Sequence, residues 1–159
     1  AHLYGLPVTG LRFFTVYGPR QRPDLAIAKF TRLIERESTI PFYGDGTTER
    51  DYTYITDIVD GVNRTLDWLL KQQPGTYDVF NLGESRTVSL SRLVEIIEEA
   101  VGKKAKIDKQ PPQPGDVIRT YADISKAKKV LGYKPSVAIE EGVKKYVEWA
   151  RNLPAEVEE

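Results

Sequence analysis

Phe13-Phe14-Thr15-Val16-Tyr17-Gly18-Pro19-Arg20-Gln21-Arg22-Pro23-Asp24 is a stretch that changes abruptly from apolar to cationic. Its apolar half, together with Leu11, predicts a buried strand, and the Gly18-Pro19 step predicts a turn. Arg20 and Arg22 then follow the carboxyl end of a strand, which is where ligands bind in open α/β sheets. Because a guanidinium fork matches the two oxygens of a carboxylate or phosphate, we expect an anion site at this edge.

Outward from this stretch, strand-like and helix-like segments alternate, which predicts an α/β fold. Further strands are expected at 41–43, 51–55, 77–82 and 106–109, and helices at 25–36, from Thr56, at 89–102, from Asp123 to Gly132, and around 139–150. We expect Asp24 and Thr56 to cap the first two helices. The second helix should bury Val59, Val62, Leu66 and Leu69, which recur at helical spacing.

Composition narrows the possible functions. The chain has 159 residues, 40% of them hydrophobic and 29% charged, which is typical of one globular domain. Lysine plus arginine equal aspartate plus glutamate at 23 each, so we expect no nucleic-acid partner and no membrane association. The absence of cysteine and the single His2 argue against thiolate or histidine metal sites and against a Ser-His-Asp triad. Nothing at the N-terminus predicts secretion, so a cytoplasmic location is expected.

Four further stretches carry a resemblance to a known family. They are Tyr43-Gly44-Asp45-Gly46-Thr47-Thr48-Glu49-Arg50-Asp51-Tyr52, Val79-Phe80-Asn81-Leu82-Gly83, Pro111-Pro112-Gln113-Pro114-Gly115-Asp116-Val117 and Thr120-Tyr121-Ala122-Asp123-Ile124-Ser125-Lys126-Ala127. With the first stretch, and in the same order, they resemble the C-terminal part of the extended short-chain dehydrogenases/reductases that act on nucleotide sugars. Within that family, the pattern is most similar to that of the UDP-glucuronate 4-epimerases.

The resemblance implies an α/β fold that combines the end of a Rossmann-like sheet with a small α/β substrate-binding domain. Residues 1–22 would be a terminal helix tail and a Rossmann-type strand, residues 23–152 the substrate-binding region, and residues 153–159 a frayed tail. No glycine-rich turn leads from a strand into a helix, and no tyrosine is followed four places later by lysine. We therefore interpret the chain as a truncated piece that holds the sugar nucleotide and contains no catalytic residue.

The same resemblance assigns roles to individual residues. Thr15 and Arg22 would contact the carboxylate of the sugar, Arg50 the phosphates and Asp116 the ribose hydroxyls. Gln113 departs from the wider family, in which an arginine commonly precedes the Gly-Asp pair by two places. For any of these arginines taken alone, a solvated surface position is the ordinary alternative.

Aromatic and aliphatic residues could line a pocket for the base. Phe42 and Tyr43 could form one wall, with Leu25 and Phe30 from the next helix, although core packing is equally open for Phe42 and favoured for Phe30. Tyr17 could reach the sugar or the nicotinamide of a cofactor, or it could be structural.

The function implied by the resemblance is an NAD-dependent inversion at C4 of UDP-glucuronate through a 4-keto intermediate. NAD would be bound mainly by a half of the enzyme outside this chain, and the full-length enzyme would be a homodimer. The alternatives are a fragment of a UDP-glucose 4-epimerase or UDP-glucuronate decarboxylase, or a non-catalytic module that binds nucleotide sugars.

Overall fold

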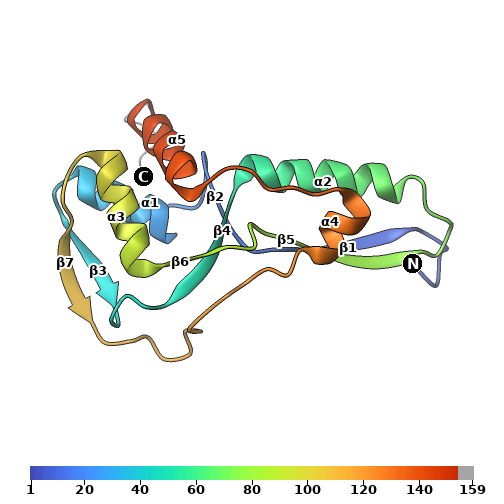
Figure 1. Cartoon of the computed structure of the whole chain (residues 1–159), viewed down its shortest axis with the longest axis horizontal. Coiled ribbons are helices and arrows are strands. Elements are labelled where there is room, and N and C mark those ends of the chain that lie inside the picture. The colour runs from blue at the N-terminus through green and yellow to red at the C-terminus, as the bar shows by residue number, and fades with distance from the viewer. Residues whose placement is uncertain (154–159) are drawn as a thin grey trace.

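The computed structural model describes residues 1–153 and combines helices with three small sheets (Figure 1). The elements are β1 (Val8–Phe13), β2 (Thr15–Tyr17), α1 (Ala26–Glu35), β3 (Thr39–Tyr43), β4 (Glu49–Tyr54), α2 (Ile55–Leu69), β5 (Tyr77–Leu82), β6 (Thr87–Ser89), α3 (Leu90–Val101), β7 (Lys106–Gln110), α4 (Ser125–Leu131) and α5 (Ile139–Arg151). β1 pairs with β5 and β3 with β7, both in parallel. In the third sheet, β4 lies between a parallel β2 and an antiparallel β6.

The molecule is elongated and has a hydrophobic core at each end. At one end, α1, α3 and α5 surround β3 and β4, and at the other α2 and α4 lie beside β1 and β5 (Figure 1). Ile34, Ile40 and Leu93 are fully buried in the first core, and Phe80, Leu82 and Tyr133 in the second. β4 and the short β2 connect the two ends, so side chains on β4 are held by both halves of the molecule.

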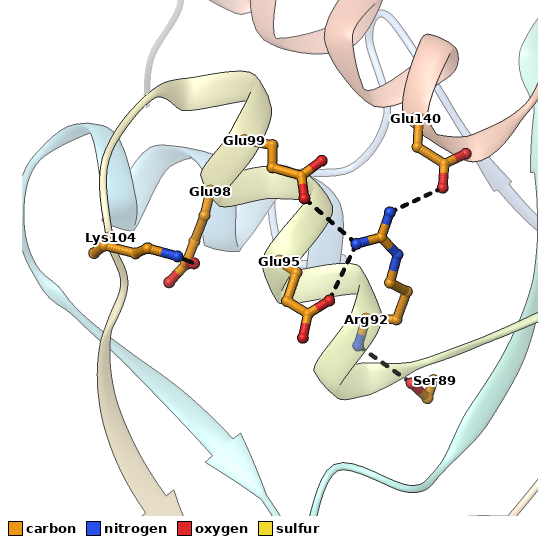
Figure 2. Close-up of polar contacts among 7 residues, drawn as sticks. All are labelled: Ser89, Arg92, Glu95, Glu98, Glu99, Lys104 and Glu140. Atoms are coloured by element: carbon orange, nitrogen blue, oxygen red, sulfur yellow. Dashed lines mark hydrogen bonds and ion pairs between the residues drawn. The ribbon is translucent and has the colours of Figure 1, made fainter.

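Two polar features occur at the end of the molecule that contains α1, α3 and α5: an N-terminal cap on α3 and an ion pair between α3 and α5. The hydroxyl of Ser89 accepts a hydrogen bond from the backbone N–H of Arg92, which caps α3, and Gly102 ends the helix with a left-handed φ of 80°. The Arg92 guanidinium donates to Glu95 and Glu99 on its own helix and to Glu140 of α5, at 3.1, 3.4 and 3.2 Å (Figure 2). This contact orients α5 relative to α3.

The predicted α/β class is confirmed, and each expected helix is present within a few residues of its expected bounds. The strand predicted around Phe13 is two strands, because the chain passes from the β5 partner to the β4 partner at Phe14. Two predicted caps are wrong. No side chain caps α1 or α2, because the Asp24 carboxylate binds Arg22 and α2 begins at Ile55, before Thr56.

The face that α2 buries is also different from the prediction. The helix packs against β1, β4 and α4 with Ile58, Gly61 and Thr65, whereas Val59, Val62 and Leu66 are 48%, 37% and 52% exposed. Gly61 permits this approach, since a Cβ there would lie 2.8 Å from the Leu82 side chain. The stripe Val59, Val62, Leu66 and Leu70, called here the outer stripe of α2, therefore has no partner within residues 1–153.

The predicted tail at 153–159 lies, apart from Leu153, outside the described residues. No helix in the described part of the chain combines the length and apolar character needed to cross a bilayer.

Candidate functional site

A cavity of about 330 Å³ opens between α1, β3, β4 and the loop that follows β7. Its walls mix aromatic, apolar and charged side chains, which are Asp24, Ala26, Lys29, Phe30, Pro41, Tyr43, Thr48, Arg50, Tyr52, Leu90, Gln113 and Asp116. This combination of flat apolar walls with a few charged groups is typical of small-molecule sites. Phe30, Tyr43, Arg50 and Asp116, which the sequence analysis names as candidate site residues, all line this cavity.

Arg50 and Asp116 form the polar centre of the cavity. One guanidinium nitrogen of Arg50, Nη2, donates to Oδ1 of Asp116, and Nη1 donates to the Glu49 carbonyl at 2.8 Å. The Arg50 side chain is only 20% exposed, so its position is well determined by these partners. Burial raises the pKa of the neighbouring Tyr52 to about 12, so its phenol stays neutral beside the guanidinium. The pair presents a fixed cation with a carboxylate next to it, suited to an anion that also carries hydroxyl groups.

The alternation of β3 decides which aromatic side chain reaches the cavity. Ile40 and Phe42 are buried in the core, whereas Pro41 and Tyr43 line the cavity from the other face of the strand. The structure thus places Phe42, predicted as a wall for the base, in the core, and Tyr43 occupies the wall. Phe30 belongs both to the core, where it is 5% exposed, and to the lining of the cavity.

Three other predicted site residues lie outside the cavity lining. Arg22 is highly exposed and binds both carboxylate oxygens of Asp24, at 3.1 and 2.7 Å. Asp24 lines the cavity, but Arg22 does not. The structure therefore does not bring Arg22 and Arg50 into one cavity. Thr15 is half-buried on β2 opposite Tyr52, and Leu25 is half-buried at the N-terminal boundary of α1.

Tyr17 was a candidate for cofactor contact, and the structure places it in the core instead. The side chain is 2% exposed, and its ring packs edge-on against Tyr54 with centroids 5.4 Å apart. Its hydroxyl has no hydrogen-bond partner among the described residues, and burial raises its pKa strongly. β2 turns this side chain inward beneath α5, so it cannot reach a ligand on the surface.

The sequence interpretation missed Asp51, which anchors the segments around the site. The side chain is fully buried on β4, and its carboxylate accepts backbone N–H groups of Glu84, Ser85 and Ala122 at 2.8, 3.0 and 3.0 Å. It also accepts the Thr53 hydroxyl at 3.3 Å. One carboxylate thereby holds the loop after β5 and the segment before α4 against the strand that carries Arg50. The only sequence signal was an acidic residue inside a run of strand-forming residues.

Glu84 is the second residue that sequence reasoning missed. It is half-buried in the loop after β5, and Oε2 has no hydrogen-bond partner within residues 1–153. Burial, reinforced by the negative charges of Asp57 and Asp51, raises the pKa of this carboxyl from its usual 4.5 to about 7. Glu84 is therefore partly protonated at neutral pH, which is a property found at functional and structural sites alike.

The described residues do not by themselves fit a dinucleotide cofactor or a metal ion. Gly44 and Gly46 have φ values of 73° and 86°, but they lead into β4 and not into a helix N-terminus that could receive a pyrophosphate. No group of three or more metal-ligating side chains gathers anywhere in the described part.

Comparison with known proteins indicates the family to which the chain belongs. The family model described as GDP-mannose 4,6 dehydratase matches residues 1–146. UDP-glucuronate 4-epimerase from Thermodesulfobacterium geofontis is 44% identical over 151 residues, which cover 94% of this chain and 45% of that protein. An uncharacterised protein from Methanocaldococcus jannaschii is 50% identical over 148 residues, or 93% of this chain and 44% of that one.

The solved structures agree. UDP-glucuronic acid 4-epimerase from Bacillus cereus, in complex with UDP-glucuronic acid and NAD, superposes with a TM-score of 0.83 at 35% identity, over 91% of this chain and 45% of that one. UDP-glucose 4-epimerase from Thermotoga maritima, with UDP-glucose, gives a TM-score of 0.80 at 35% identity, over 90% and 45%. The chain spans slightly less than half the length of these relatives. The family model matches residues 1–146 of the 159-residue chain, and the predicted likeness to nucleotide-sugar epimerases is confirmed. The chain therefore belongs to the GDP-mannose 4,6 dehydratase family.

Proposed function

We propose that the chain is the UDP-sugar-binding part of an NAD-dependent UDP-glucuronate 4-epimerase, which inverts C4 through a 4-keto intermediate. The observation that carries the proposal is the cavity in which Arg50, Asp116 and Tyr43 meet. Arg50 would bind the diphosphate, Asp116 the ribose hydroxyls and Tyr43 the base, with Phe30 behind it. Relatives and solved structures that carry this activity in their names support the choice of sugar.

The second support is a surface that has no partner within the described residues. β1 has one strand neighbour only, and the outer stripe of α2 is exposed beside it. A parallel two-stranded sheet with an apolar helix face beside it is the expected edge of a larger sheet. We infer that a dinucleotide-binding half packs there, carries NAD and supplies the proton-transferring residues. Residues 1–22 would then belong to that sheet, and residues 23–152 to the substrate-binding region.

In this arrangement the chain contributes by positioning. It would hold UDP rigidly while the sugar turns over between the two hydride-transfer steps, which requires tight contacts to the nucleotide and looser ones to the sugar. Thr15 and Arg22 would bind the sugar carboxylate, and for this Arg22 must leave Asp24, with which it now pairs at the surface.

Calorimetric titration of the chain with UDP, UDP-glucuronate and UDP-glucose tests these roles. Arg50→Ala should weaken all three ligands by about 10- to 100-fold, since it removes a charge-assisted contact to phosphate. Arg22→Ala should weaken UDP-glucuronate alone. Arg64→Ala, an exposed arginine on α2 outside the cavity, is the matched control and should change nothing. If Arg22→Ala and Arg50→Ala weaken both sugars equally, the assigned roles are wrong.

Two alternative functions are distinguished by turnover assays of the whole protein. A UDP-glucose 4-epimerase would bind and turn over UDP-glucose as well as UDP-glucuronate in the whole protein, and Arg22 would then have no carboxylate to bind. A non-catalytic module would bind the sugars but show no conversion of UDP-glucuronate to UDP-galacturonate when the whole protein is assayed with NAD.

A further inference from the structure

A second and larger cavity, of about 720 Å³, lies between α1 and α5 and is also lined by Arg20, Gln21 and Pro23. Its lining shares no residue with the cavity around Arg50. Helix α1 is the wall between them, with Ala26 and Lys29 on one side and Ala28 and Arg32 on the other. None of the roles proposed above uses this second cavity.

Arginine side chains line part of the second cavity. Among its described lining residues are Arg20, Arg32, Arg36 and Arg151, with Glu35 as the described carboxylate. Arg36 has a partner of its own, and Arg151 is paired with Glu35, because its Nε donates to Oε1 at 2.6 Å while Nη2 donates to the Val101 carbonyl at 2.6 Å. Arg20 and Arg32 add positive charge to the described wall, in a chain whose positive and negative residues are equal in number. A low-dielectric hollow with such a rim attracts anions.

Arg20 lines the cavity from a strained backbone conformation. Arg20 has a φ of 65°, a left-handed conformation that is unfavourable for a residue with a Cβ. The turn is fixed by a hydrogen bond from the Gln21 N–H to the Gly18 carbonyl at 3.1 Å, and by the Gln21 side-chain oxygen accepting the Gly18 N–H at 3.3 Å. Strain that the surroundings maintain in this way is characteristic of ligand sites.

The interior of the cavity is flat and apolar, with a polar atom in its wall that is not used. The rings of Tyr146 and Trp149 stand 5.6 Å apart at 43°, beside Ala150 and Leu153. The hydroxyl of Thr31, which is 2% exposed, has no hydrogen-bond partner among the residues that the structure describes. Buried polar atoms without partners are uncommon, and each calls for an explanation.

We propose that this cavity binds a planar organic anion, an aromatic ring that carries a carboxylate or a phosphate. The ring packs against Trp149 and Tyr146, and the charged group is bound by Arg20 and Arg32. Aromatic carboxylates and nucleoside monophosphates share this chemistry.

The two tryptophans of the chain provide the test, because Trp149 lines the cavity while Trp68 packs on Phe80 in the other core. In ¹⁵N-labelled chain, the indole N–H signal of Trp149 should shift saturably with 2-naphthoate or with uridine 5′-monophosphate, and that of Trp68 should not. Naphthalenemethanol, uridine and inorganic phosphate, which lack either the charge or the ring, should leave Trp149 unchanged. Which of the two anions binds identifies the source of the ligand.

Variants distinguish a built site from a passive hollow. Arg32→Gln should weaken the effective anion about tenfold, as expected for one charge-assisted contact, whereas Arg64→Gln on α2 should not. Repeating the titration in Arg50→Ala separates this cavity from the cavity around Arg50, since Trp149 should respond as before. The proposal is overturned if the neutral compounds shift Trp149 equally, if neither anion shifts it at about 10 mM, or if Arg32→Gln has no effect in a chain that remains folded by circular dichroism.

Discussion

Asp51 is the residue on which the arrangement around the cavity lined by Arg50 and Asp116 most depends. Its buried carboxylate accepts three backbone N–H groups from two separate segments. Asp51→Asn replaces one acceptor by a donor that faces N–H groups, so we expect a loss of about 3 kcal/mol in the free energy of unfolding, measured in urea. Asp67→Asn on the exposed side of α2 is the control and should change it by less than about 0.5 kcal/mol. A loss as small as that of the control would contradict the anchoring role.

Glu84 should make stability depend on pH. Because its folded-state pKa of about 7 lies above the usual 4.5, the folded chain binds this proton more tightly than the unfolded chain does. The resulting stabilisation is complete below about pH 4.5 and is lost as the pH rises through 7. Glu84→Gln, which mimics the neutral acid, should therefore stabilise the chain at pH 8 by about 1 kcal/mol after allowance for solvent screening, and hardly at all at pH 5.

Urea midpoints of both proteins at the two pH values measure this difference. Glu148→Gln, on the exposed face of α5, should leave the pH dependence of the wild type unchanged. Equal stabilisation by Glu84→Gln at both pH values would show that the protonation of Glu84 is not the cause.

Among individual residues, the sequence analysis identified those whose type and neighbours in the chain suggest a role. It missed those whose role depends on their surroundings in the folded structure. Arg50 and Asp116 were found because they stand in recognisable stretches, and they do meet. Asp51 stands in the same stretch as Arg50, but its residue type does not show that it is buried whereas Asp67 is exposed, and the orientation of Phe42 depends on which face of β3 is covered. Burial and strand facing are tertiary properties, so a single sequence does not determine them.

Helix α5 depends on one glycine where it crosses β2. A Cβ added at Gly142 would lie 2.0 Å from the Tyr17 hydroxyl and 2.7 Å from its ring carbon Cζ. Gly142→Ala should therefore destabilise the chain by about 1–3 kcal/mol by overpacking, although alanine favours helix over glycine by about 1 kcal/mol. Thermal or urea unfolding measures the change.

A double-mutant cycle identifies the cause. Tyr17→Phe removes a hydroxyl that has no partner in the described part of the chain, so alone it should cost little. Combined with Gly142→Ala it should recover part of the loss, because the closest atom is gone while the ring remains. Strict additivity of the two changes would mean that the contact is not responsible.

Helix α2 shows why element positions were easier to predict than element faces. The periodicity of apolar residues correctly predicted a helix. The helix has two apolar faces, however, and the larger one, the outer stripe, was expected to be the buried one. The structure buries the smaller face because Gly61 lets the helix approach Leu82 and Tyr133 closely. Ile58→Ala should therefore cost about 2–4 kcal/mol of unfolding free energy, whereas Leu66→Ala should cost below about 1 kcal/mol. Reversed costs, measured in urea, would contradict this orientation.

The whole molecule exposes a face that a soluble monomer rarely leaves uncovered. The outer stripe of α2 is exposed, and Phe13 of β1 is 51% exposed. We expect the 159-residue chain to self-associate with rising concentration, and Leu66→Lys to lower the association constant at least tenfold because it places a charge in the apolar contact. Sedimentation equilibrium measures both, with Val130→Lys on α4, at an exposed apolar residue away from α2, as the control. A chain that is monomeric at all concentrations would contradict the prediction.

Both arginines assigned to the substrate already hold an aspartate of their own, Arg50 through Asp116 and Arg22 through Asp24. Each resident carboxylate acts as a built-in counter-ion, and a solute must exchange with it to enter. Chloride or acetate offers no more than the aspartate does and gains nothing by the exchange. A diphosphate brings more charge than the aspartate that it replaces. In the proposed roles, the two aspartates would thereby keep the small anions of the solvent from binding these arginines.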